Sequence, residues 1–260
     1  MRVYSAGGFA DDGAAMMFIK AAALARPDVA AEYEGTLEGP LEDDSVLVTM
    51  LRRVPSTIEK GTVMGAIMKR GPRGYVSLPC SLKELRKGAR VAVCIPVAAR
   101  ALEESRPWLQ VVLADSAEEC LSMLDSGEVE AAVLPEMEVL ISGIGIANSV
   151  EDGLLPQAAS QGAVGVICRS DDDNALSWAR SVNHPPTRIE IGVERGVLKM
   201  MGAGPFTPVG VSGTLSDMFV HVKASSYVCP EGRRDVDDYV AIDYVMDDLL
   251  DIGDYLSGKR

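Results

Sequence analysis

Cysteine and histidine are the residues of this sequence best suited to metal binding and to catalysis. Their spacing argues against a metal site, a disulfide framework and a catalytic triad. The five cysteines occur without any Cys-x-x-Cys pair, at Cys80, Cys94, Cys120, Cys168 and Cys229. This pattern argues against a zinc site and against a disulfide framework. His184 precedes two prolines and His221 falls in an expected strand, and neither has a partner at metal or triad spacing. We therefore predict no metal site and reduced, mostly buried thiols.

Two short stretches could bind an anion. Arg52 and Arg53 end an expected strand, and guanidinium groups pair well with carboxylates. Paired arginines at a strand end are also often simply solvated, so both interpretations stay open. Gly7 and Gly8 follow the first expected strand, as in a phosphate-binding loop. Their spacing matches no specific fingerprint, and a tight turn explains them as well.

Alternating strand and helix patterns must position these residues. We expect a first unit with strands at 3–6, 29–35, 45–51, 62–70 and 74–79 and a helix at 11–25. A second unit restarts after 80–88, with strands at 89–96, 109–115 and 131–135 and helices at 97–105 and 116–130. Such alternation favours sheets covered by helices. The apolar stretch 162–169 reads as a strand that could bridge back to the first unit.

The last part of the chain has a different pattern. A capping box at Thr187 to Glu190 predicts a helix that ends at Gly202, and a similar box at Ser116 to Glu119 opens the helix of the second unit. Strands at 209–213 and 218–223 and a helix at 240–256 follow. We therefore predict three parts: a first α/β lobe of residues 1–82 with 169–185, a second α/β lobe of residues 83–168, and a small α+β domain of residues 186–260. A cleft between the two lobes is the expected ligand site.

The composition is that of a soluble globular protein, with 47% hydrophobic and 24% charged residues. The net charge of −13 argues against nucleic-acid binding. No apolar run approaches the roughly 20 residues that cross a bilayer, and the start of the chain lacks the features of a signal peptide. We expect a cytoplasmic protein without a membrane segment.

Several motifs occur in an order that resembles one known family. The matching positions are Pro156, Gln161, Gly162, Ala163, Arg169, Thr187, Glu194, Arg195, Gly204, Pro208 and Gly210. They resemble the porphobilinogen deaminase (hydroxymethylbilane synthase) family, with weaker similarity back to residue 45. The resemblance implies two hinged lobes like those of periplasmic binding proteins, plus a small third domain. It also implies a dipyrromethane primer on a cysteine, a catalytic aspartate, and arginines and lysines that hold carboxylates.

The residues that carry out the family's chemistry differ here. The cysteine position that follows Gly204 is Pro205, and the family's Lys-Asp falls on Arg52 and Arg53. Paired arginines of the family fall on Val97 and Ala98. Cys94 is the best alternative thiol, although a cysteine at a strand end is more often a small buried hydrophobic residue.

The resemblance and these differences together lead to a set of expectations. We assign no catalytic residue, expect no dipyrromethane, and expect a degenerate family member that binds a pyrrole or small anion or acts on a tetrapyrrole-pathway enzyme. Candidate cleft residues are Gly7, Gly8, Arg52, Arg53, Cys94 and Gln161, and Pro205 marks the lost attachment position. The alternative is an enzyme, either a deaminase with a displaced cofactor site or one repurposed to other chemistry.

Overall fold

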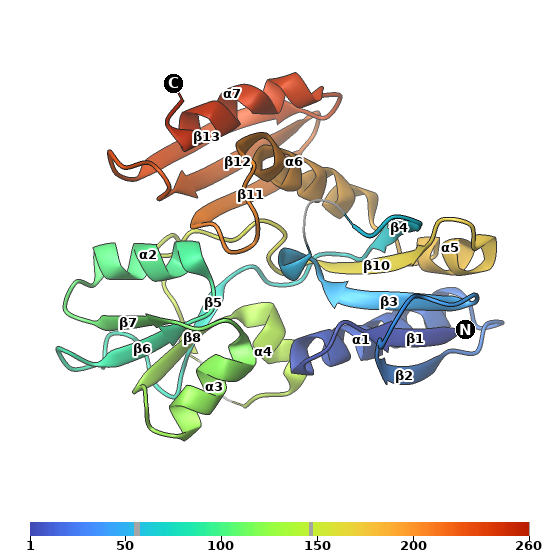
Figure 1. Ribbon diagram of the computed structural model, residues 1–260, viewed down its shortest axis with the longest axis horizontal. Helices are drawn as coiled ribbons and strands as arrows, with labels where there is room; N and C mark the ends of the chain where they lie inside the picture. The colour runs from blue at the N-terminus through green and yellow to red at the C-terminus, as the bar shows by residue number, and fades with distance from the viewer. Residues whose placement is uncertain (55–57, 146–147, 260) are drawn as a thin grey trace.

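Three β-sheets organise the computed structural model, which describes residues 1–54, 58–145 and 148–259. Figure 1 shows the first two sheets side by side and the third above them. The first two sheets belong to α/β lobes, and the third is antiparallel and packs against helices. The predicted arrangement of two α/β lobes and a smaller α+β domain is confirmed.

The sheet of the first lobe has the order β2-β1-β3-β10-β4. Its strands are β1 (Arg2–Ser5), β2 (Glu32–Thr36), β3 (Ser45–Met50), β4 (Thr62–Ile67) and β10 (Val164–Arg169). Helices α1 (Phe9–Ala25) and α5 (Asp173–Arg180) meet over one face, where the rings of Phe18 and Trp178 lie 4.7 Å apart, edge to face. Every second residue of β3, from Val46 to Met50, joins this core, so the residues between them face the other side of the sheet.

The connection from β2 to β3 is unusual for a lobe of this kind. Both strands run parallel to β1, which lies between them. A connection between parallel strands normally takes a dozen or more residues and forms a helix. Here it consists of residues 37–44, all described and none helical. One face of the first sheet is therefore covered by helices, while this connection covers the other face only thinly.

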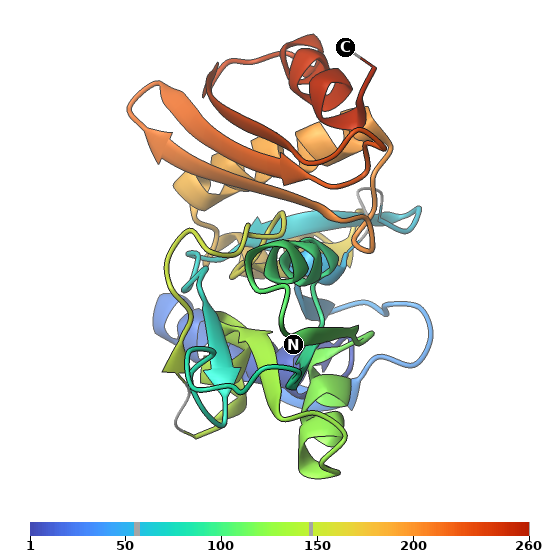
Figure 2. The same ribbon diagram turned by 90° about the vertical axis from the view of Figure 1, so that its left-hand side faces the viewer.

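The sheet of the second lobe has the order β7-β6-β8-β5-β9. Its strands are β5 (Tyr75–Leu78), β6 (Arg90–Val93), β7 (Gln110–Leu113), β8 (Ala131–Pro135) and β9 (Asn148–Ser149). Its helices are α2 (Pro96–Ser105), α3 (Ala117–Asp125) and α4 (Glu136–Ser142). Figure 2 shows α2 between this lobe and the third sheet. Helix α4 packs against α1, so the two lobes are in direct contact.

The third domain combines α6 (Pro185–Met201) and α7 (Met246–Ser257) with strands β11 (Val209–Ser216), β12 (Phe219–Ser226) and β13 (Arg234–Ala241). The sequence did not predict β13, because its Arg-Asp-Val-Asp-Asp pattern is largely exposed and acidic. The last helix begins at Met246, later than the predicted residue 240, since residues 240 and 241 belong to this strand.

The two predicted capping boxes had different outcomes. Ser116 accepts a hydrogen bond from the Glu119 amide at 3.1 Å, so the cap at the start of α3 is confirmed. The cap at Thr187 is wrong, because α6 already begins at Pro185. His184 is the capping residue, and its Nδ1 accepts from the Thr187 amide at 3.3 Å. Proline is favoured in the first helical turn, where its missing N–H costs nothing.

The chain crosses between the lobes twice, through residues 68–74 and 150–163. Strand β5 therefore belongs to the second lobe and β10 to the first. The predicted boundaries at 82/83 and 168/169 need correction on this point. Strand β10 indeed bridges back, and it pairs antiparallel with both β3 and β4.

Candidate ligand-binding cleft

Arg52 lies in the 3-10 helix η1 (Leu51–Arg53), which continues directly from β3. Its guanidinium reaches the second lobe and forms a bidentate ion pair with Glu138 of α4, with 2.8 Å between Nη2 and Oε2. The Glu138 side chain is fully buried and that of Arg52 is 10% exposed. Burial alone would lower the pKa of Arg52, but the adjacent Glu138 carboxylate outweighs it and raises that pKa. Arg52 therefore links the lobes in its charged form.

Arg53 makes a second link between the lobes. Its Nη2 donates to Glu118 Oε2 of α3 at 3.1 Å, and its Nη1 lies 3.6 Å from Asp11 Oδ2 of α1. Burial raises the pKa of Glu118, yet a hydrogen bond to its own amide and the Arg53 charge outweigh this and leave the pKa lowered. Both arginines predicted to bind a ligand are thus held by acidic side chains of the protein itself.

Gly7 and Gly8 form the turn between β1 and α1, with φ angles of +101° and +89°. A Cβ on Gly8 would lie 2.4 Å from Glu118 Oε1, so only glycine lets this carboxylate approach the start of α1. The same oxygen is buried and has no hydrogen-bond partner among the described residues. The first turn of a helix carries partial positive charge, which favours an anion there. Glu118 therefore occupies the place that a ligand carboxylate would prefer.

Cys94 directly follows β6 and is almost fully buried, at 5% exposure. Its Sγ lies 3.9 Å from Arg52 Nη2. A hydrogen bond from the Cys120 thiol lowers the pKa of Cys94, and the Arg52 charge acts in the same direction against the effect of burial. The structure thus places the predicted thiol next to Arg52, but beneath the surface.

Gln161 lies in the second crossing between the lobes. Its Nε2 donates to the carbonyl oxygens of Arg73 and Gly74, and its Oε1 accepts from the Ala158 amide. The polar atoms of its side chain are therefore used within the hinge. The side chain stabilises the hinge and has no free group to offer a ligand.

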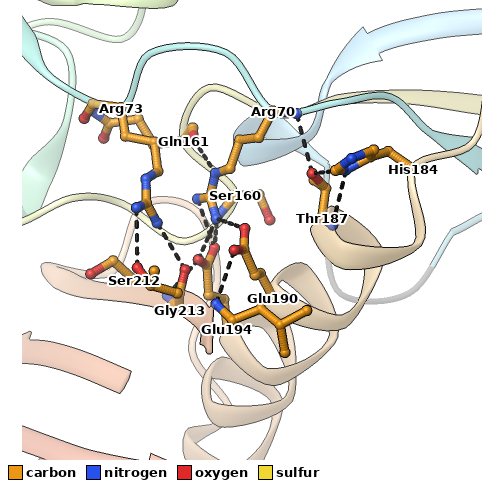
Figure 3. Close-up of polar contacts among 12 residues, drawn as sticks. Arg70, Arg73, Ser160, Gln161, His184, Thr187, Glu190, Glu194, Ser212 and Gly213 are labelled. Carbon is orange, nitrogen blue, oxygen red and sulfur yellow. Dashed lines mark hydrogen bonds and ion pairs between the residues drawn. The ribbon is translucent and has the colours of Figure 1, made fainter. Parts of the chain in front are cut away.

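Arg70 and Glu194 join the hinge to the third domain, and the sequence did not single out Arg70. The pair is bidentate, with 2.6 Å between Nη1 and Oε1 and 3.1 Å between Nη2 and Oε2. The carboxylate also accepts from the amides of Ser160 and Gly213 at 2.6 and 2.7 Å (Figure 3). The family-like positions Gln161, Thr187 and Glu194 meet at this node, which we call the hinge node.

Pro205 lies in the turn between α6 and β11. The turn is held by Thr207, whose Oγ1 accepts from the Gly204 amide at 3.0 Å and whose amide donates back to the Gly204 carbonyl. Pro205 and Arg52 line one small cavity of about 20 Å³, together with Ser160 and Arg195. The turn that matches the family's attachment loop therefore does face the cleft, next to Arg52.

The acidic partners Asp11, Glu118 and Glu138 were not predicted from the sequence. Local patterns gave no signal for Glu138, whose burial in α4 is seen only in the structure. Within the described ranges, no group of three or more His, Cys, Asp or Glu side chains could hold a metal ion. The described helices are also all too short or too polar to cross a bilayer.

Comparison with known proteins identifies relatives over much of the chain. Residues 23–177 match the family model for the dipyrromethane cofactor binding domain of porphobilinogen deaminase. The porphobilinogen deaminase of Desulforudis audaxviator is 30% identical over 176 residues, covering 65% of this chain and 57% of that protein. That of Nitrosomonas europaea is 31% identical over 182 residues, covering 67% and 59%. The chain thus spans less than two thirds of the length of these relatives.

Solved structures of similar shape are more distant. A periplasmic substrate-binding protein of an ABC transporter from Coxiella burnetii has 18% identity and a TM-score of 0.43, covering 71% of this chain and 92% of its own. The methionine-binding protein MetQ has 15% identity and a TM-score of 0.45, covering 70% and 88%. At this level the similarity concerns the fold alone.

The family model corrects our expectation about the cofactor. We expected no dipyrromethane, but the matched residues correspond to the domain that is named for binding it. The surroundings of the turn nevertheless do not fit this group in the arrangement seen here. Pro205 has no thiol for a thioether bond, and the cavity beside it, at about 20 Å³, has room for one water rather than two pyrrole rings.

The matched region covers more than half of the chain, and it contains both cleft arginines and most of the two lobes. Of the family-like residues outside it, Thr187 and Glu194 belong to the hinge node. The chain belongs to the porphobilinogen deaminase family.

Proposed function

We propose that this protein binds a small carboxylated molecule, such as a pyrrole of tetrapyrrole biosynthesis, and does not polymerise porphobilinogen. One observation carries the proposal. Arg52 and Arg53, which replace the Lys-Asp of the family, are both held by carboxylates of the opposite lobe. An arginine at the aspartate position would repel a cationic pyrrole intermediate instead of stabilising it. The protein would then act as a binding or regulatory member of the pathway.

The Arg53 link supports a route for the ligand. The Arg53 side chain is 24% exposed and that of Glu118 is 33% exposed, so water reaches this pair more readily than the Arg52–Glu138 pair. A ligand carboxylate could take the place of Glu118 on Arg53 and at the start of α1. Binding would therefore compete with the link between the lobes and would favour an opened cleft.

A second candidate function is an active or repurposed enzyme, and Cys94 favours it. This thiol lies beside Arg52 at 3.9 Å and has a lowered pKa. The thiolate is the nucleophilic form of cysteine. Such an enzyme would need the cleft to open before a substrate could reach the buried sulfur.

Porphobilinogen turnover and binding, measured on the same protein sample, separate the two candidates. We expect calorimetric binding without ammonia release. Glu118→Gln should bind several-fold more tightly because Arg53 is freed, and Arg53→Gln should bind about tenfold more weakly. Arg100→Gln, which removes an exposed arginine paired with Glu103, should bind like the original protein.

The enzyme candidate has a contrasting result. Ammonia release together with a stable gain in protein mass, both lost in Cys94→Ala, would establish it in place of the binding role. Binding that is unchanged in both Glu118→Gln and Arg53→Gln would show that the ligand does not use the cleft.

A further inference from the structure

The thinly covered face of the first sheet contains a cavity of about 470 Å³. It lies under the connection from β2 to β3, where a crossover helix would normally pack. Its apolar wall is formed by Leu37, Leu41, Leu47, Val54, Ile58 and Ile167. The volume falls within the range of small-molecule sites, which are typically apolar with a few polar groups.

Asp11 is the polar group at one end of this cavity, and its side chain is only 2% exposed. Oδ1 is well satisfied, since it accepts from the Met50 amide at 2.6 Å and from Thr49 Oγ1 at 3.0 Å. Oδ2 lies 3.6 Å from Arg53 Nη1, which is beyond hydrogen-bond length. The cavity therefore presents a buried carboxylate oxygen that can accept a hydrogen bond.

The charged side chains in and next to this cavity favour a cation. Asp11 and Glu59 line the cavity along with one basic residue, Arg53, and Arg53 is already shared with Glu118. These four side chains carry a net charge of −2. Burial raises the pKa of Asp11 because it disfavours the ionised carboxylate, and a bound donor would act in the opposite direction. A carboxylate in this place would meet like charge.

We propose that the cavity is a binding site for a small organic amine, with its ammonium group donating to Asp11 Oδ2 and its apolar body lying along Leu47 and Ile167. Leu47 alternates with the core residues of β3 and so faces this side of the sheet. The cavity shares Gly7 and Arg53 with the carboxylate site proposed in the cleft, but the proposed ammonium contact is with Asp11.

Three probes of one shape test the charge preference: benzylamine, benzyl alcohol and benzoate. Amide shifts in ¹H–¹⁵N spectra of the full chain report where each probe binds. We expect benzylamine to shift residues around Asp11 and Leu47 and to bind about tenfold more tightly than benzyl alcohol, since hydrogen bonds to charged groups are the stronger ones. Equal binding of the amine and the alcohol, tighter binding of benzoate, or no binding of any probe would overturn the proposal.

Two variants and a control assign the site. Asp11→Asn keeps an acceptor for Met50 and Thr49 and should weaken benzylamine binding about tenfold. Leu37→Trp should block the cavity from its partly exposed rim without touching Asp11, which keeps the test valid if Asp11→Asn fails to fold. Leu24→Trp, at an 88% exposed position of α1, should change nothing. Benzylamine affinity unchanged in Leu37→Trp would refute the site, whatever porphobilinogen does in the cleft.

Discussion

Two buried arginine–glutamate pairs connect the parts of this molecule, and they differ in how the carboxylate is supported. At the hinge node, Glu194 accepts from Arg70 and also from the amides of Ser160 and Gly213. In the cleft, Glu138 receives both of its bonds from Arg52. The family-like positions Thr187 and Glu194 lie at the first pair. The second pair contains Arg52, one of the positions where we expect the sequence to depart from the family.

Replacing the glutamate should lower the free energy of unfolding more at the hinge node than at the cleft pair. Glu194→Gln leaves Arg70, which is 6% exposed, without its main counter-charge, although Glu190 lies 3.6 Å away. Removing one partner of a buried pair costs about 3–5 kcal/mol, so we expect a loss of about 3 kcal/mol or more in the free energy of unfolding. Urea denaturation measures it. Glu231→Gln, on an 80% exposed side chain, should cost less than about 1 kcal/mol. Equal losses in Glu194→Gln and Glu231→Gln would contradict the expected difference between a buried and an exposed pair.

The cleft pair should tolerate replacement of both partners better than loss of one. Glu138→Gln leaves the Arg52 guanidinium without its counter-charge and should lower the free energy of unfolding by about 3 kcal/mol. Arg52→Met combined with Glu138→Leu should recover much of that loss, because apolar residues often replace a buried ion pair without net cost. A double variant less stable than Glu138→Gln alone would show that the ion pair stabilises the fold more than apolar packing at the same place does.

A smaller effect is expected at the start of α6, which carries Glu194. His184→Ala removes the acceptor for the Thr187 amide and should cost about 1 kcal/mol, as typical caps do. His184→Asn supplies another capping side chain and should restore most of the stability. Thermal unfolding of the two variants gives the comparison, and a loss in both alike would mean that the imidazole acts through packing.

The smallest expected effect concerns Glu118, whose pair with Arg53 is partly exposed. Glu118→Gln should cost at most about 1 kcal/mol at neutral pH. Because folding lowers the pKa of Glu118 from the ordinary value of 4.5, its ionised form stabilises the fold above that value, and the contribution is lost as the pH falls through the folded pKa. Unfolding temperatures measured from pH 6 to pH 3 should therefore fall less steeply in Glu118→Gln, and parallel curves would contradict this linkage.

Local patterns predicted much of this fold. Strand and helix alternation gave the three parts, and the cap at Ser116 was correct because it depends on four neighbouring residues. The place of β10 between β3 and β4 depends on pairing across more than a hundred residues, so the domain boundaries shifted. The alternation also missed β13, whose exposed acidic face resembles a loop.

The candidate site was predicted only in part. The sequence identified Arg52 and Arg53, but their partners lie 86 and 65 residues further along the chain. Those partners depend on how α3 and α4 meet the first lobe, which no local pattern encodes. Gln161 was placed in the ligand cleft because it belongs to a family motif, and the structure gives it a hinge role. A motif can identify a family through residues that shape the molecule rather than through those that act on a ligand.

The place of β10 between β3 and β4 has a consequence for the order in which the protein can form during its synthesis. Strands β1 to β4 leave the ribosome first, yet β3 and β4 are joined only through β10, which follows the whole of the second lobe. Domains generally fold in the order in which they are made. Here the second lobe can complete its sheet while the first still lacks the strand between β3 and β4, so the N-terminal lobe is the later of the two to close.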